Sequence, residues 1–168
     1  TLRTMPSATA LVLDSLPYLL DYPYGCVEQT VSRFVPAVQT KRAFQQAGVP
    51  LDAATQRKIA EITQLSLERL SRMQTSDGGW GWWEGDEPTL WTTAYAVWGL
   101  HKAKQAGVNV PDTMYRNGVA TLRRLLERAL QIRPQRSEQE SYSYWDWAEA
   151  LFAMQVLAAV DPTPPDAL

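Results

Sequence analysis

The chain contains one cysteine and one histidine among 168 residues, and this scarcity excludes several common kinds of site. A lone cysteine cannot form an intrachain disulfide, so Cys26 contributes either to packing or to chemistry. One cysteine and one histidine are also too few for a conventional zinc site. We expect no metal and no cofactor.

A basic block and a long apolar run are absent as well. The formal net charge is −2, and nothing indicates a nucleic-acid groove or an anionic membrane surface as a partner. No apolar run approaches the length that spans a bilayer, and the first residues do not have the pattern of a signal peptide. The length allows one domain, residues 1–168, with a real hydrophobic core.

Apolar spacing and stop signals predict an all-α protein, and no segment alternates convincingly like a strand. For example, Gly48-Val49-Pro50 combines a helix-ending glycine with a following proline. The expected helices cover residues 8–20, 26–47, 52–73, 89–106, 111–131 and 144–159. A loop at 74–87 carries three tryptophans, Trp80, Trp82 and Trp83.

An internal repeat is visible at an offset of 59 residues. Ala47-Gly48-Val49 and Ala106-Gly107-Val108 each end one expected helix and precede another that opens near an aspartate. Two helices per repeat indicate helix pairs stacked side by side, an arrangement that several families close into an α/α toroid.

Chemistry concentrates in the segment from Tyr22 to Thr30, which reads Tyr-Pro-Tyr-Gly-Cys-Val-Glu-Gln-Thr. Cys26 follows a Pro/Gly turn and is expected to open a helix, where the positive end of the helix dipole favours a thiolate. Gln29 lies three residues on, so its side chain shares a helix face with Cys26. The thiolate could attack the Gln29 amide carbon with loss of ammonia and close an internal thioester.

These residues resemble the thioester motif Gly-Cys-x-Glu-Gln of the alpha-2-macroglobulin and complement family, and the preceding Tyr-Pro-Tyr is most similar to its bacterial members. The resemblance implies that Cys26 and Gln29 form the bond, with Gly25 and Glu28 completing the motif. It implies a covalent protease trap that reacts once per thioester and is not an enzyme. The implied partners are proteases, coupled through lysine amines, and other domains of a parent protein in the periplasm or anchored in the inner membrane facing it.

The resemblance also implies more helix pairs than this chain supplies. We therefore expect an incomplete toroid corresponding to its N-terminal half. Helix faces left uncovered by the missing pairs would favour self-association of the fragment.

Two interpretations of the aromatic residues remain open. A thioester survives only where water is excluded, so Tyr22, Tyr24 and the three loop tryptophans are candidates for a shield. Ordinary packing is the alternative, and Tyr22 and Tyr24 are the better candidates because they adjoin Cys26. Glu28 is expected mainly to place favourable charge in the first helical turn.

His101 is interpreted as a solvated helix residue. Complement members use a histidine from a later repeat to direct coupling toward hydroxyls, but no histidine occurs in the corresponding region, 137–144. The chain therefore resembles members that couple mainly to amines.

Three alternatives stay open. The chain could be a helical interaction module with an inert cysteine. Asp77-Gly78-Gly79-Trp80, after Gln74, resembles the Gln/Trp motif of triterpene cyclases, although no acidic cluster accompanies it. A cysteine-nucleophile hydrolase or transferase would need a base, and His101 has no evident orienting partner in the sequence.

Overall fold

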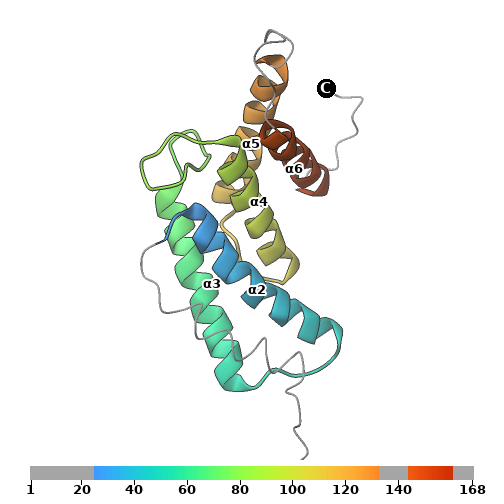
Figure 1. Ribbon diagram of the computed structural model, residues 1–168. Helices are drawn as coiled ribbons and strands as arrows, with labels where there is room; N and C mark the ends of the chain where they lie inside the picture. Colours follow the sequence, from blue (N-terminus) through green and yellow to red (C-terminus); the bar gives the residue numbers. More distant parts are fainter. Residues whose placement is uncertain (1–24, 133–143, 161–168) are drawn as a thin grey trace, which may run out of the picture.

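The computed structural model describes residues 25–132 and 144–160, and all regular secondary structure in those ranges is helical (Figure 1). An isolated bridge between Gln74 and Trp80 is the sole β-type pairing there. The all-α class predicted from the sequence is confirmed. The helices are α2 (Val27–Gln46), α3 (Ala53–Met73), α4 (Leu90–Gln105), α5 (Asp112–Ile132) and α6 (Tyr144–Val160).

The predicted helix boundaries agree with these to within one or two residues, because local signals set them. Asp52 caps α3 by accepting hydrogen bonds from the backbone amides of Ala54 and Thr55, both at 2.9 Å. Gly48 and Gly107 follow α2 and α4 with φ of +66° and +71°, the left-handed conformation that ends helices at low cost for glycine. The helix expected at 8–20 lies outside the described residues.

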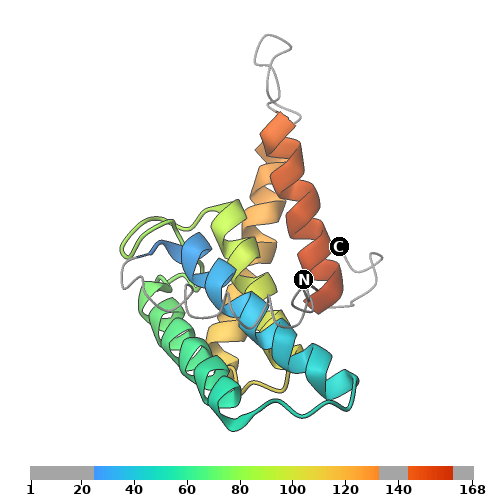
Figure 2. The same cartoon turned by 60° about the horizontal axis from the view of Figure 1, so that its bottom comes forward.

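The helices form successive pairs. α2 packs against α3 and α4, while α4 packs against α5 and α6. Ser32 contacts Tyr95 and Arg42 contacts Gln105, each pair 63 residues apart, so α2 and α4 run parallel. Figure 2 shows α3 on one side of α2 and α4 on the other. The N-terminal ends of α2 and α4 therefore lie at the same end of the molecule.

The predicted repeat is confirmed in the helices themselves. α3 and α5 both contain 21 residues, and both their starts and their ends are 59 residues apart, as are Gly48 and Gly107. Stacked helix pairs of this kind are the architecture of an α/α toroid.

Small residues allow the close crossing of α2 and α4. A Cβ added to Gly99 would lie 2.7 Å from Val31 Cγ1 and 3.1 Å from the end of the Phe34 ring. Val31 and Phe34 are fully buried, so their side chains have no room to move away. Gly99 thus fixes how closely the two helices approach.

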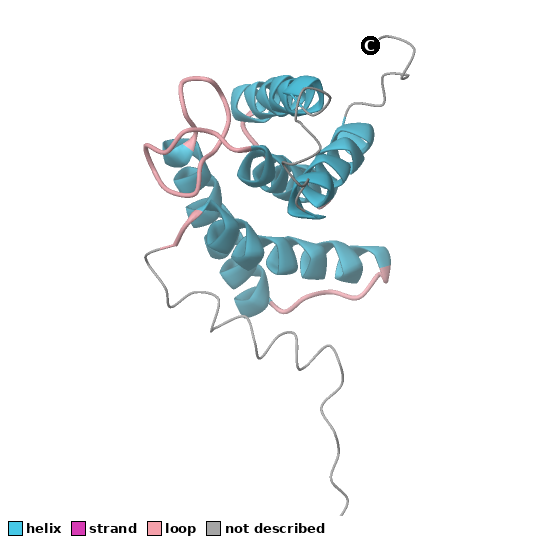
Figure 3. Ribbon diagram, turned by 45° about the horizontal axis from the view of Figure 1, so that its top comes forward, coloured by secondary structure: helices cyan, strands magenta, loops and turns pink. Residues whose placement is uncertain are grey.

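The tryptophan loop, residues 74–89, joins α3 to α4 and lies beside the N-terminal end of α2 (Figure 3). Trp80 anchors it: the fully buried ring donates a hydrogen bond from Nε1 to the Leu70 carbonyl at 2.8 Å. The Trp80 backbone N–H donates to Thr93 Oγ1 at 3.0 Å, and its carbonyl accepts from Thr89 N at 3.1 Å. Trp80 therefore ties the loop to both α3 and α4.

None of the helices within the described ranges is long and apolar enough to cross a membrane.

Candidate functional site

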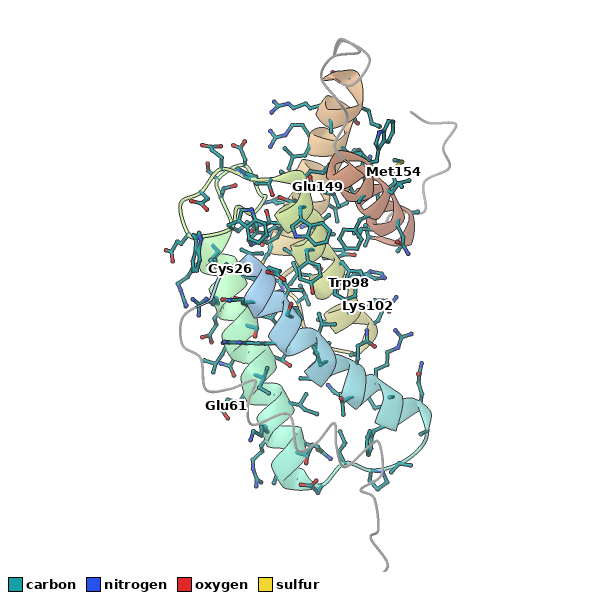
Figure 4. The ribbon with its side chains drawn as sticks, in the orientation of Figure 1. Cys26, Glu61, Trp98, Lys102, Glu149 and Met154 are labelled. Atoms are coloured by element: carbon teal, nitrogen blue, oxygen red, sulfur yellow. The ribbon has the colours of Figure 1, made fainter. Side chains whose placement is uncertain are left out.

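Cys26 is the N-cap residue of α2, as the sequence predicted (Figure 4). Its backbone is extended, with ψ of 175°, and the chain becomes helical at Val27. The side chain is 6% exposed and forms no disulfide. The thiol thus sits at the first turn of a helix, shielded from most of the solvent.

The structure brings Cys26 and Gln29 together in a reciprocal capping box. The Cys26 backbone N–H donates a hydrogen bond to Gln29 Oε1 at 3.2 Å, while the backbone amide of Gln29 faces the Cys26 side chain. The Gln29 side chain therefore folds back over the helix start instead of extending into solvent. This conformation presents the side-chain amide of Gln29 to the residue that carries the thiol.

Gly25 makes room for this fold-back. A Cβ at position 25 would lie 3.1 Å from Gln29 Oε1 and 3.3 Å from Gln29 Cβ, closer than nine in ten real Cβ contacts. A Cβ at this position would take space next to the folded-back Gln29 side chain, which gives a steric reason for glycine here. Gly25 is the motif residue whose role was not evident from the sequence.

Two further contacts hold the first turn of α2. The Cys26 carbonyl accepts from both the backbone N–H and the hydroxyl of Thr30, at 3.0 and 2.9 Å. The backbone N–H of Val27 donates to the Trp82 carbonyl at 3.0 Å. Since the first N–H groups of a helix have no partner within the helix, Trp82 satisfies one of them from a distant part of the chain.

The link to Trp82 is the part of the site that sequence reasoning missed. The interaction uses a main-chain carbonyl, so no side-chain pattern marks it. Expectations for the loop tryptophans focused on their rings. Trp80 is a buried anchor of the fold, whereas Trp82 and Trp83 are 42% and 56% exposed.

The remaining motif residues differ in position. Glu28 is partly exposed in the first turn of α2, where a carboxylate complements the helix dipole. Gln29 is exposed, so an incoming reactant has access to its amide. Tyr22 and Tyr24, the predicted shield, lie outside the described residues.

His101 is only partly exposed, whereas the sequence predicted a solvated helix residue. It is partly buried, and its Nδ1 lies 3.1 Å from the Tyr115 hydroxyl while Nε2 lies 2.7 Å from Gln105 Nε2. Burial lowers the pKa of His101, and the neighbouring cations Lys102, Arg42 and Lys104 lower it further.

His101 lies far from the thiol. The contact of His101 with Gln105, which itself contacts Arg42, places the histidine toward the C-terminal end of α2, about three helical turns or more from Cys26. This placement argues against His101 as a base for the thiol.

A groove of about 1220 Å³ lies between α3, the C-terminal part of α2 and the α4–α5 connection. Its apolar lining includes Phe44, Ile59 and Leu67, and the one carboxylate among its lining residues is Glu68. A cyclase that protonates a polyene needs converging acids, so the groove does not favour that alternative. Elsewhere in the described ranges, no three His, Cys, Asp or Glu side chains gather as a metal-binding group.

Comparison with known proteins identifies relatives of this chain. The profile of the A-macroglobulin TED domain matches residues 1–124. An alpha-2-macroglobulin of Thermotoga maritima is 39% identical over 123 residues, which is 73% of this chain and 7% of that protein. The chain therefore spans a small part of the length of the curated relatives that it matches.

Solved structures agree with the sequence comparisons. A crystal structure of native alpha-2-macroglobulin from Escherichia coli, spanning domain MG7 to the C-terminus, matches 93% of this chain and 24% of its own, with a TM-score of 0.66 and 29% identity. Salmonella alpha-2-macroglobulin reacted with methylamine matches 91% of this chain and 10% of its own, with a TM-score of 0.65 and 29% identity.

Proposed function

Because the chain belongs to the A-macroglobulin TED domain family, we propose that it carries the thioester of a bacterial alpha-2-macroglobulin and couples covalently to attacking proteases. Residues 1–168 are then part of a thioester-containing α/α-toroid domain. The observation that carries the proposal is the folded-back side chain of Gln29, whose Oε1 accepts a hydrogen bond from the backbone of Cys26.

The first reaction step closes the thioester. Cys26 Sγ attacks Gln29 Cδ, the bond from Cδ to Nε2 breaks, and the thiol proton leaves with the nitrogen as ammonia. No oxidant or metal takes part. The capping box reduces the conformational freedom that the two side chains lose when the ring closes.

The second step couples the target. A lysine ε-amine attacks the Gln29 carbonyl carbon, the bond from carbon to sulfur breaks, and a proton from the amine passes to the departing sulfur. The product is an amide at Gln29 and a free thiol at Cys26. Each thioester reacts once, so the protein acts as an inhibitor and not as a catalyst.

Amines are the proposed nucleophiles for two reasons. His101 lies toward the opposite end of α2 and α4 and so does not supply an acyl-imidazole route to hydroxyls. The similar Salmonella protein is one that reacted with methylamine, a small primary amine. A lysine on the surface of a protease offers the same functional group.

The remaining parts of the proposal concern the parent protein. Proteolysis of a bait segment elsewhere would expose the thioester, and Tyr22 and Tyr24 would help to exclude water before that event. The protein would act in the periplasm, free or anchored in the inner membrane. These expectations come from the family resemblance.

The direct test is intact mass and thiol titration of the full chain, before and after methylamine. The proposal expects a mass lower than the sequence mass by one ammonia, no titratable thiol, and release of one thiol on addition of methylamine. Cys26→Ala is the matched control and should show neither the mass deficit nor coupling. A chain of full mass whose thiol is free from the start would instead support an interaction module with an inert cysteine.

A further inference from the structure

We propose that the backbone N–H of Cys26 is the oxyanion donor for the thioester chemistry, with Gly25 as the residue that allows the carbonyl oxygen of Gln29 to reach it. This inference rests on the proposed function and deepens it. The function requires that Cys26 and Gln29 react, whereas the inference concerns the group that stabilises the charge which develops on oxygen.

The geometry identifies the atoms. Gln29 carries one side-chain oxygen, Oε1, and it is this oxygen that the Cys26 N–H contacts at 3.2 Å. When Sγ attacks Cδ, the electron pair of the carbonyl bond moves onto Oε1. The oxygen is retained while Nε2 departs, so the same N–H faces the carbonyl of the finished thioester. When an amine later attacks Cδ, negative charge again develops on Oε1.

The N–H group is well placed to act as a donor. It belongs to the cap of α2, where amides have no partner within the helix and point toward the N-terminal end. The carbonyl of the same residue is held by Thr30, and the next amide along the chain is held by Trp82. Both groups belong to the Cys26–Val27 peptide, so the peptide that follows the donor is held before the reaction, and preorganised donors need no rearrangement when charge appears.

Gly25 is the positioning residue. An alanine Cβ would stand 3.1 Å from Oε1, so the oxygen would have to move away from Cys26 N. The same Cβ would stand 3.3 Å from Gln29 Cβ, so the whole side chain of Gln29 must give way. Gly25→Ala therefore moves the oxygen away from its donor while both reacting residues, Cys26 and Gln29, are retained.

The test compares the rates at which methylamine releases the thiol of the full-length chain. Gly25→Ala should react about 10- to 100-fold more slowly than the wild type, at or below the lower end of the range for complete removal of one oxyanion donor. Thr89→Ala is the matched control, since it removes the side chain that caps α4 by accepting from the Thr92 amide at 3.2 Å and leaves the Cys26 N–H contact intact. It should react within about twofold of the wild-type rate.

A spectroscopic measurement distinguishes this role from a general disturbance of the site. A hydrogen-bonded thioester carbonyl has a lower stretching frequency, so Gly25→Ala should raise that frequency and Thr89→Ala should not. Equal rates and equal carbonyl frequencies in the wild type and Gly25→Ala would overturn the inference while leaving the proposed function standing.

Hydrogen exchange tests the contact between the Cys26 N–H and Gln29 Oε1 even if the isolated chain forms no thioester. The Cys26 amide should be protected in the wild type and should lose protection in Gln29→Ala and Gly25→Ala. Unchanged protection in both variants would show that Oε1 is not its partner and would overturn the inference. If only the proposed function fails, the chain has the full mass expected from its sequence and a free thiol at Cys26, while the protection of the Cys26 amide is unaffected.

Discussion

The first turns of α2 and α4 occupy corresponding places in parallel helices but are capped by different chemistry. Contacts between the two helices join residues 63 apart, so Cys26 corresponds to Thr89 and Gln29 to Thr92. At α4, Thr89 Oγ1 accepts from the Thr92 backbone N–H at 3.2 Å and shares a hydrogen bond with its hydroxyl at 2.7 Å. At α2, a longer side chain reaches back to the cap residue instead.

The comparison teaches that the reactive site is a modified helix cap. The Thr89 cap joins two hydroxyls and one amide in hydrogen bonds, which stabilises the start of α4 and has no further chemistry. The Cys26 cap places a thiol and a side-chain amide in the same positions. The residue before each cap also differs: Gly25, which leaves space for the Gln29 side chain, precedes Cys26, whereas Pro88 precedes Thr89.

The largest expected effect comes from removing Trp80, which anchors the loop that contacts the starts of both α2 and α4. Trp80→Ala should lower the free energy of unfolding by about 3–5 kcal/mol, because it leaves a cavity in the core and removes the bond to Leu70. Since the tryptophan loop contacts the starts of both α2 and α4, coupling to methylamine should fall as well. Urea denaturation measures the loss. Trp83→Ala, which removes an exposed ring, should change stability by less than about 0.5 kcal/mol, and an equal loss in both variants would contradict this account.

Thr89→Ala should affect one helix start only. The loss of an N-cap side chain costs about 1 kcal/mol, and thermal or urea denaturation would detect it. Thiol release by methylamine should keep the wild-type rate, because the Cys26 cap is not touched. A marked fall in the coupling rate at preserved folding would show that the two caps are coupled more tightly than their contacts indicate.

Gln29→Ala should give the opposite pattern. The exposed amide contributes one hydrogen bond to the helix start, so the loss of stability should be only about 0.5 kcal/mol. Coupling should nevertheless disappear completely, since no electrophilic carbon remains. Mass spectrometry after methylamine treatment checks the result, and any addition that depends on Cys26 in this variant would contradict the assignment of Gln29.

The smallest expected effect concerns the other end of the two helices. The folded state lowers the pKa of His101 from its ordinary value of 6.5, so the unfolded chain binds a proton more readily in this pH range. The stability gained from neutral His101 is therefore complete above pH 6.5 and is lost as the pH falls below it. The melting temperature should decrease slightly between pH 7.5 and 5.5. His101→Gln should flatten this dependence, whereas an unchanged slope would assign it to other groups.

Most of the fold could be predicted from the sequence because its signals are local. Helix-ending glycines and the Asp52 cap set the boundaries, and the 59-residue offset reappears in two helices of equal length. The pairing of Cys26 with Gln29 was predictable for the same reason, since residues three apart share a helix face.

The parts that could not be predicted depend on contacts between distant segments. The Trp82 carbonyl reaches Val27 across 55 residues of sequence, and its role does not depend on the type of side chain. One of the two partners of His101 is Tyr115 on the next helix, and only packing of α4 on α5 reveals that contact. The sequence left open whether Trp80 shields the thioester or packs in the core, and the structure shows it buried as an anchor of the fold.

The use of a main-chain carbonyl at Trp82 also bears on how this region can change. The bond to Val27 is independent of the side chain at position 82, so substitutions there leave the start of α2 intact. An exposed ring next to the reactive cap can thus be exchanged for other side chains to suit whatever surface lies over it. The bond that holds the helix start therefore places no constraint on the type of side chain at position 82.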